Sequence, residues 1–152
     1  MSDVDQPQSL ETRARELMKR SPAGSLATVD DGGHPYASMV EVVGDEEGAL
    51  WMLISDLAVH TQNLKGDERA SLLLDDSRGA GEERLNELRA TYVGRARSVE
   101  DPPQEVVEAY LEVHPQAKQW VGFKDFGWVR LEVERVRVVA GFGQIGWVDW
   151  QR

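Results

Sequence analysis

The chain contains no cysteine among its 152 residues. This absence excludes disulfides, thiolate metal sites and cysteine nucleophiles. Histidine is scarce as well, because His34, His60 and His114 are the only three in the sequence. Three histidines leave little for a protein-ligated zinc site, and we predict no metal site, although a carboxylate-rich one stays open.

Long hydrophobic runs are also missing. The longest, Ala49–Ile54, is far shorter than the roughly 20 residues that a membrane-spanning helix needs. The segment Met1–Gln8 is polar and acidic and lacks the basic start and apolar stretch of a signal peptide. Basic residues are outnumbered, 17 against 27, which gives a net charge of −10. We therefore expect a cytoplasmic protein whose main partner is neither nucleic acid nor a membrane.

Several common catalytic and phosphate-binding motifs are absent. The sequence has no P-loop, no G-x-S-x-G elbow and no H-E-x-x-H pair. Gly141, Gly143 and Gly146 have the spacing of a dinucleotide fingerprint, but the chain ends six residues later. That leaves no room for the βαβ unit that such a site requires.

What is present indicates an ordinary globular protein. Hydrophobic residues make up 41% and charged residues 29% of the chain, and its length suits one domain. We predict a disordered lead-in over residues 1–8 and a single domain over residues 9–152. Ser9 can cap a first helix, whose apolar positions have helical spacing. These positions are Leu10, Ala14, Leu17 and Met18.

About seven short β-rich runs, separated by turn residues, follow this helix. Strands joined in successive hairpins indicate an antiparallel barrel or sandwich rather than a parallel sheet. Near the C-terminus the period-two pattern slips by one residue at Glu134–Arg135, which requires a bulge or a turn. We interpret the slip as a hairpin of strands 127–133 and 136–141. The aromatic tail with Trp147 and Trp150 predicts docking on another surface, for example that of a second subunit.

A polar turn with a helix start follows the strand over residues 50–54. Ser55 or Asp56 is predicted to cap a short helix that ends near Leu64. Free N–H groups and the helix dipole at such a start favour an anion, and Ser55, His60 and Thr61 could add donors. The alternative interpretation is a plain capped helix with His60 on its surface.

Three stretches together, covering about residues 9–146, resemble one known family, the FMN-binding split barrels related to pyridoxamine-phosphate oxidase. The branch most similar to this sequence is the one labelled haem-utilisation proteins. The stretches are Gly24–Val29 with Gly33–Ser38, Leu53–Leu64 with Asp67–Leu74, and His114–Ala117 with Phe123–Phe126, Arg130–Leu131 and Gly141–Gly143.

The resemblance implies a mainly β fold, a split, antiparallel Greek-key β-barrel with short helices. It also implies a homodimer with FMN in a cleft lined by both subunits. The implied cofactor-binding residues fall into four groups along the chain. They are Ser38, Met39, Val40 and Glu41 along the flavin ring; Ser55, His60 and Thr61 near the phosphate; Arg89 as a polar contact; and Phe126 and Phe142 where the partner covers the flavin.

The sequence departs from true pyridoxamine-phosphate oxidases at two cationic positions. Compared with the enzymes that it resembles, this sequence has Ser38 in place of a phosphate-binding arginine and Val43 in place of a lysine. We therefore expect a flavin-dependent oxidoreductase other than pyridoxamine-phosphate oxidase, with no general acid or base identified. The alternatives are a haem-binding protein that ligates iron through His60 or His114, a deazaflavin-binding barrel, and a barrel that binds its ligand without turnover.

Overall fold

A computed structural model describes residues 8–76, 87–141 and 143–150. The described residues form three α-helices, one 3-10 helix and eight strands. In chain order these are α1 (Leu10–Arg20), β1 (Ala23–Val29), β2 (Pro35–Glu41), β3 (Val43–Gly44), β4 (Leu50–Ser55), α2 (Val59–Gly66), β5 (Arg69–Asp75), β6 (Arg89–Val99), α3 (Gln104–Val113), the 3-10 helix η2 (Pro115–Gln119), β7 (Phe126–Val139) and β8 (Ile145–Asp149).

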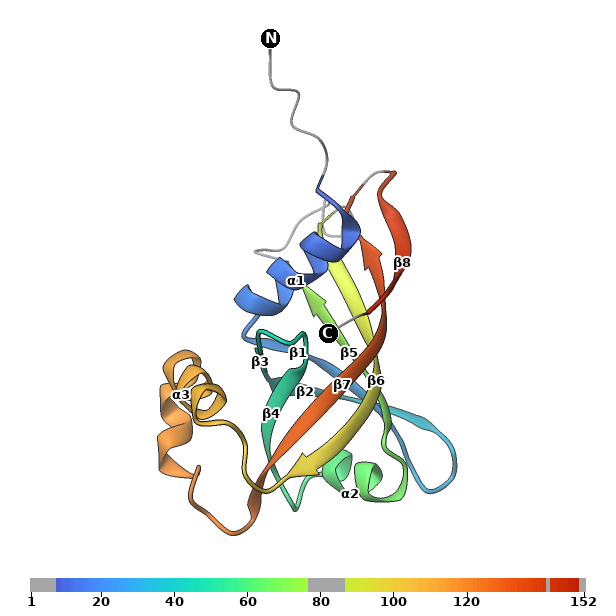
Figure 1. Ribbon diagram of the computed structural model, residues 1–152. Helices are drawn as coiled ribbons and strands as arrows, with labels where there is room; N and C mark the ends of the chain where they lie inside the picture. Colours follow the sequence, from blue (N-terminus) through green and yellow to red (C-terminus); the bar gives the residue numbers. More distant parts are fainter. Residues whose placement is uncertain (1–7, 77–86, 142, 151–152) are drawn as a thin grey trace.

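The strands form one curled antiparallel sheet (Figure 1). Their order is β2-β1-β5-β6-β7-β4-β3, and β8 pairs with β7 outside this path. The long strands β6 and β7 run through the whole curl and join its two halves. The expected mainly β, antiparallel fold is therefore confirmed. Within the described ranges no helix is long and apolar enough to span a membrane.

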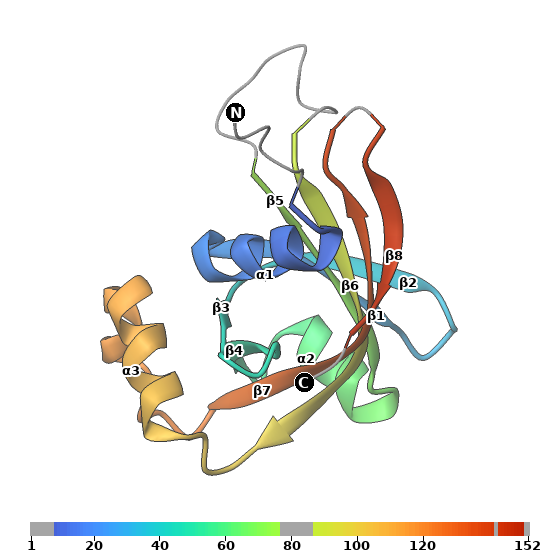
Figure 2. The same ribbon diagram turned by 45° about the horizontal axis from the view of Figure 1, so that its top comes forward.

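The core lies on the inner face of the curl. Alternating residues of β1, β5 and β6 point inward, as the period-two pattern of a strand requires. Helix α1 covers this face (Figure 2) and begins where predicted, because the Ser9 hydroxyl accepts the Thr12 N–H. The buried Tyr92 hydroxyl donates to the Ala14 carbonyl at 2.6 Å, which ties the helix to β6.

A second, smaller core lies outside the curl. Helices α3 and η2 stand beside β3 and β4 (Figures 1 and 2). Tyr110 and Ala117 from these helices pack on Leu53 of β4 and Trp128 of β7. This layer brings α3 and η2 next to the strand ends where the candidate site is found.

The predicted C-terminal hairpin is wrong. Residues 126–139 form the single strand β7, which pairs with β6 along its length. The register shifts so that Val93 faces Arg135 while Gly94 faces Val133, and Glu134 is the extra residue of a β-bulge. A Cβ at Gly94 would lie 1.8 Å from the Glu132 carbonyl oxygen. The pattern slip therefore marks a close approach of two backbones, which only glycine allows.

The aromatic tail docks on its own chain. Strand β8 pairs with β7, and the Nε1 atom of the buried Trp150 donates to the Gly48 carbonyl at 2.7 Å. The Arg15 guanidinium lies 4.2 Å from the centre of the Trp150 ring. Trp150 therefore does not need a second subunit to be covered, whereas Trp147 stays half-exposed.

The predicted cap of α2 is also wrong. The helix begins at Val59 with Ala58 as the N-cap residue, and no side chain caps it. Ser55 remains in β4 because it pairs with Phe126 of β7, and its hydroxyl accepts the Leu57 N–H in the turn. The division into a lead-in over residues 1–8 and one domain stays a prediction, because residues 1–7 lie outside the described part.

Candidate functional site

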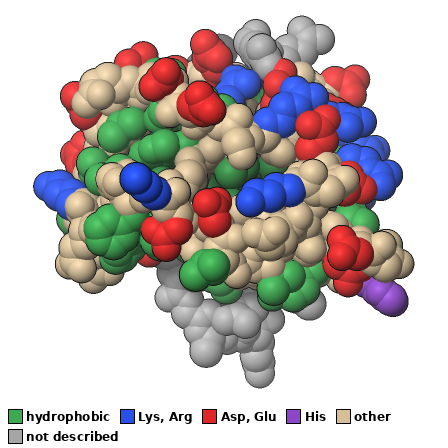
Figure 3. All heavy atoms as spheres, turned by 90° about the horizontal axis from the view of Figure 1, so that it is seen from below, with side chains coloured by type: hydrophobic (Ala, Val, Ile, Leu, Met, Phe, Trp, Pro, Cys, Tyr) green, Lys and Arg blue, Asp and Glu red, His purple; other side chains and the backbone are tan. Residues whose placement is uncertain are grey.

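A cleft of about 330 Å³ opens where β2, β4, α2 and the α3–η2 layer meet. The end of the molecule seen in Figure 3 carries hydrophobic side chains gathered on the side of α3. Six residues predicted from the resemblance come together in this cleft. They are Met39, Val40, Glu41, Ser55, His60 and Phe126. Ser38 contacts the cleft through His60, as described below.

His60 lies in the first turn of α2 and is partly buried. Its Nδ1 is 3.0 Å from the Ser38 hydroxyl, while its buried Nε2 has no hydrogen-bond partner among the described residues. Burial lowers the pKa of the His60 imidazole, which favours the neutral form. When Nδ1–H donates to Ser38, Nε2 carries a free lone pair; in the other tautomer Nε2 is a free donor.

The opposite wall contains a group of polar residues from β2 and α3. The Glu41 carboxylate lies 3.5 Å from Nδ1 of His114, whose Nε2 lies 3.0 Å from the Val42 carbonyl. The Tyr110 hydroxyl accepts the Leu53 N–H at 3.4 Å, and burial raises the pKa of Tyr110 to about 12. His114 is buried and does not line the cleft, so His60 is the histidine that the cleft presents.

Aromatic rings form the third side of the cleft. Trp120 and Phe126 lie with ring centroids 5.9 Å apart and an interplanar angle of 31°, and Phe123 contacts Phe126 from outside. The Met39 side chain on the facing strand is 70% exposed. Such walls suit a flat, largely apolar ligand that stacks on rings. Sequence reasoning missed Tyr110 and Trp120 here, because α3 and η2 reach the cleft only through tertiary packing.

Three predicted residues lie elsewhere or are not described. The buried Thr61 donates its hydroxyl to the Ser55 carbonyl at 2.6 Å, so it closes the turn before α2 rather than facing the cleft. Arg89 begins β6 opposite Val139, whereas the far end of β6, Val99, pairs with Trp128 beside the cleft. At about 3.3 Å per residue, roughly 30 Å of strand separates these two ends. Phe142 lies outside the described residues.

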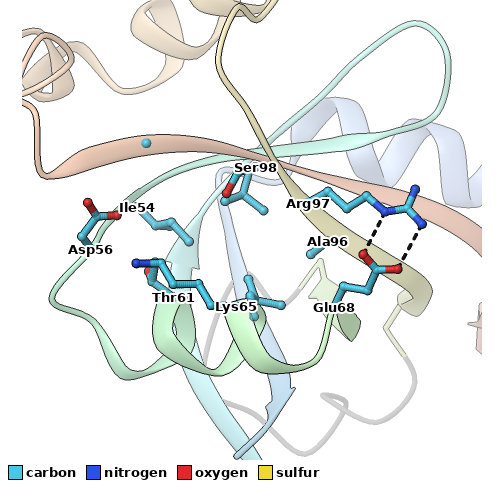
Figure 4. Close-up of a pocket in the computed structure, with 11 residues that line it drawn as sticks. Ile54, Asp56, Thr61, Lys65, Glu68, Ala96, Arg97 and Ser98 are labelled. Atoms are coloured by element: carbon cyan, nitrogen blue, oxygen red, sulfur yellow. Dashed lines mark hydrogen bonds and ion pairs between the residues drawn. The ribbon is translucent and has the colours of Figure 1, made fainter.

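Thr61 instead lines a second cavity of about 230 Å³ beneath α2 (Figure 4). Its floor is apolar, and Asp56 and Lys65 lie on one side of its rim. On the other side, Arg97 donates two hydrogen bonds to Glu68, at 2.9 and 3.1 Å. The two charges of this pair satisfy each other, so the pair itself offers no recognition group comparable to the free Nε2 of His60.

Comparison with known proteins places the chain in a family. Residues 6–152 match the family described as CREG, beta-barrel. The chain belongs to the CREG β-barrel family. The match covers all described residues of the cleft, from Ser38 to Phe126.

Two relatives of this CREG β-barrel protein carry haem-related names. It is 33% identical over 155 residues to HOZ, a chloroplastic heme oxygenase of Arabidopsis thaliana, covering 92% of this chain and 47% of HOZ. It is 29% identical over 143 residues to the heme oxygenase HutZ of Vibrio cholerae, covering 89% of this chain and 78% of HutZ. The chain thus spans about half the length of HOZ.

Solved structures give the same picture of the fold. A heme binding protein from Mycobacterium smegmatis matches with a TM-score of 0.82 and 32% identity, over 96% of this chain and 60% of that one. A pyridoxamine 5'-phosphate oxidase candidate from Listeria innocua matches with a TM-score of 0.65 and 18% identity, over 86% of this chain and 98% of that one. The second likeness shows the fold alone, and it confirms the predicted split barrel.

Proposed function

We propose that this protein binds haem in the cleft between β2, β4 and α2, with His60 as the iron ligand. The observation that supports this most is the buried Nε2 of His60, which lines the cleft and has no partner among the described residues. A neutral imidazole whose other nitrogen is held by a hydrogen bond is a common metal ligand in proteins. Ser38 supplies that hydrogen bond here.

The donor set of the cleft fits haem better than it fits FMN. Among the described lining residues there is one carboxylate, Glu41, and no lysine or arginine. A flavin phosphate would meet this carboxylate without a compensating cation. A porphyrin instead needs apolar and aromatic walls, which Leu53, Trp120 and Phe126 provide, and its two propionates would have to lie outside the cleft, away from Glu41.

The named relatives support the same proposal. HOZ and HutZ are heme oxygenases by name, and the Mycobacterium smegmatis protein is a heme binding protein. Bound haem would supply redox-active iron, whose reactivity the surrounding residues tune. In this chain His60 would hold the iron, Ser38 would orient the imidazole, and Trp120 with Phe126 would keep water from one face.

A flavin-dependent oxidoreductase is the second candidate. It is favoured by the amino end of α2, which has no side-chain cap, and by the His60 tautomer in which Nε2 is a donor. Both features suit an anionic group such as a flavin phosphate. The lack of a cation among the described residues of the cleft makes this function the weaker of the two. A larger deazaflavin with an acidic tail would meet the same difficulty.

We also propose that the protein works as a homodimer. A cleft of about 330 Å³ is at the small end of ligand sites, which span roughly 300–1,000 Å³, so much of a haem would protrude from it. Exposed apolar side chains lie next to the cleft, and a second subunit could cover them together with the ligand. Met39 lines the cleft, Leu57 and Val59 flank the lining residue Ala58 in the chain, and Phe123 contacts the lining residue Phe126. We call these four residues the apolar rim. The expected cytoplasmic location stays a prediction from the sequence.

Parallel titrations of the purified protein with haemin and FMN test the haem proposal. We expect a Soret band on haemin addition, with a dissociation constant of about 1 µM or lower, and little quenching of flavin fluorescence. The His60→Ala variant should lose or shift this band. His34→Ala is the matched control, because His34 lies on the exposed β1–β2 turn. Tight FMN binding without a haemin response would overturn the proposal in favour of the flavin function.

A further inference from the structure

We propose that Tyr110 is the hydrogen-bond donor of the cleft, and that its hydroxyl binds an oxygen atom of a small molecule held there by the haem. Tyr110 lies in α3, lines the cleft and is 1% exposed. The nature of the acceptor rests on the proposed haem function. The unused donor does not, because it is a property of the ligand-free protein.

Inside the protein the Tyr110 hydroxyl acts only as an acceptor. It accepts the Leu53 N–H at 3.4 Å, and no described residue accepts its own hydrogen. The Glu41 carboxylate, which also lines the cleft, contacts Nδ1 of His114 instead. A hydroxyl is a donor as well as an acceptor, and a buried donor that stays unpaired costs free energy. The hydrogen of Tyr110 therefore needs an acceptor from outside the chain, and the cleft is where one can bind.

The other two tyrosines differ from Tyr110 in this respect. Tyr92 is equally buried, but its hydroxyl donates to the Ala14 carbonyl at 2.6 Å. Tyr36 is 38% exposed on β2, so water can accept its hydrogen. Among the described residues, Tyr110 is thus the one buried tyrosine whose hydrogen has no acceptor.

Packing holds the ring of Tyr110 in place, so the hydroxyl cannot turn to another acceptor. The ring centroid lies 4.6 Å from that of His114 and 5.0 Å from that of Trp128, which it meets edge to face. The bond from the Leu53 N–H places the oxygen beside β4 and polarises the hydroxyl, since hydrogen bonds in a chain strengthen one another. A donor that is held ready in this way gives the cleft specificity for an acceptor at that place.

Tyr110 and His60 complement each other as partners of one bound group. They come from different walls of the cleft, α3 and α2, and the buried Nε2 of His60 is likewise without a partner among the described residues. A small molecule bound to an iron that His60 ligates would meet the Tyr110 hydroxyl. Burial raises the pKa of Tyr110 to about 12, so the hydroxyl keeps its hydrogen at neutral pH and stays a donor.

Carbon-13 NMR of the ligand-free full chain, labelled at Cζ of its tyrosines, tests the unused donor. In a mixture of light and heavy water, a hydroxyl that exchanges slowly gives two Cζ signals, and one that exchanges rapidly gives a single averaged signal. We expect two signals for Tyr92, whose hydrogen is bonded inside the protein. Tyr110 should give one signal, because its hydrogen faces the cleft. Two signals for Tyr110 would show that the hydroxyl is closed off from the cleft and would overturn the proposal.

The C–O stretching frequency of the reduced haem complex with carbon monoxide tests the contact with a bound molecule. Tyr110→Phe removes the hydroxyl and keeps the ring, so it should fold and bind haemin as the wild type does. A donor near the oxygen weakens the C–O bond, so the frequency should shift upward in Tyr110→Phe. Tyr36→Phe is the matched control, because Tyr36 does not line the cleft, and it should leave the frequency unchanged.

The same frequency in wild type and Tyr110→Phe would overturn the proposal, because it would show that the hydroxyl does not reach the bound molecule. Failure of the wild type to bind haemin would instead contradict the proposed function. The NMR result on the ligand-free chain would then still stand.

Discussion

At the scale of single residues, His60 differs from the other two histidines in its surroundings. His34 is exposed on a turn, and both ring nitrogens of His114 lie near protein oxygens. His60 combines partial burial, one hydrogen bond to Ser38 and one free nitrogen. Burial alone is enough to hold it neutral, because the charged imidazolium loses hydration when it is enclosed.

This leads to a pH dependence of stability. The unfolded chain takes up a proton on His60 near pH 6.5, whereas the folded chain does so only at lower pH, because burial lowers the pKa. The unfolded state therefore binds more protons in this window, and the free energy of unfolding should fall as the pH drops below about 6.5. Urea unfolding of wild type and His60→Gln at several pH values between 5 and 8 measures this change in the free energy of unfolding.

The variant should show a smaller loss of stability on acidification than the wild type. His34→Gln provides the comparison, because it removes an exposed histidine and should follow the wild-type curve. Identical curves for wild type and His60→Gln would show that burial does not hold the imidazole neutral in the folded protein.

At the scale of secondary-structure elements, the β-bulge at Glu134 shapes the C-terminal half. The bulge lets two sets of alternating residues point into the core although their parity differs; these are Val129, Leu131 and Val133 before it and Val136 and Val138 after it. The carbonyl of Glu134, which has no partner in the β6–β7 register, accepts the Trp150 N–H at 3.1 Å. The same irregularity thus also anchors the end of β8.

Substitution of Gly94 should expose the importance of this close approach. In Gly94→Ala the new Cβ would meet backbone atoms of Glu132, which cannot move without disturbing β7. Overpacking of this kind costs about 1–3 kcal/mol, and more where backbone must shift. Gly127→Ala is the matched strand control, because nothing lies within 4 Å of its Cβ position. Thermal unfolding followed by circular dichroism should show a lower Tm for Gly94→Ala only; equal Tm values would contradict the observed geometry.

At the scale of the whole molecule, the apolar rim lies beside the cleft and contrasts with an otherwise acidic chain. Leu57 is 84% exposed, and Met39, Val59 and Phe123 are at least half exposed. A net charge of −10 opposes self-association, so two copies would need a sufficiently large apolar contact to overcome it. The rim provides such surface at the place where the ligand is expected.

We therefore expect a dimer in sedimentation equilibrium at micromolar concentration, with dissociation favoured by Leu57→Asp. A buried charge without a partner at the interface should raise the dimer dissociation constant at least tenfold, and the monomer fold should persist because Leu57 is exposed. Gln116→Asp adds the same charge on the exposed surface of η2 and should leave the dimer intact. A monomeric wild type would contradict the homodimer proposal.

The sequence by itself determined the local features of this protein. The cap of α1 at Ser9, the period-two strands and the antiparallel pairing of strands adjacent in the chain, such as β1 with β2, all follow from residues close together in the chain. The resemblance to the split-barrel family also predicted six residues that line the cleft. They lie on two short segments, Met39–Glu41 and Ser55–His60, and at the start of β7.

Only the tertiary structure decided the features that depend on distant contacts. A hairpin and a β-bulge produce the same slip in the period-two sequence pattern. The pairing of Gly94 with Val133, next to that of Val93 with Arg135, shows that the slip is a bulge. Trp150 contacts Gly48, and Glu41 contacts His114, so each contact joins residues more than 70 positions apart in the chain. The distance of Arg89 from the cleft depends on the path of the long strand β6. Their common cause is packing of separate elements, which local patterns do not encode.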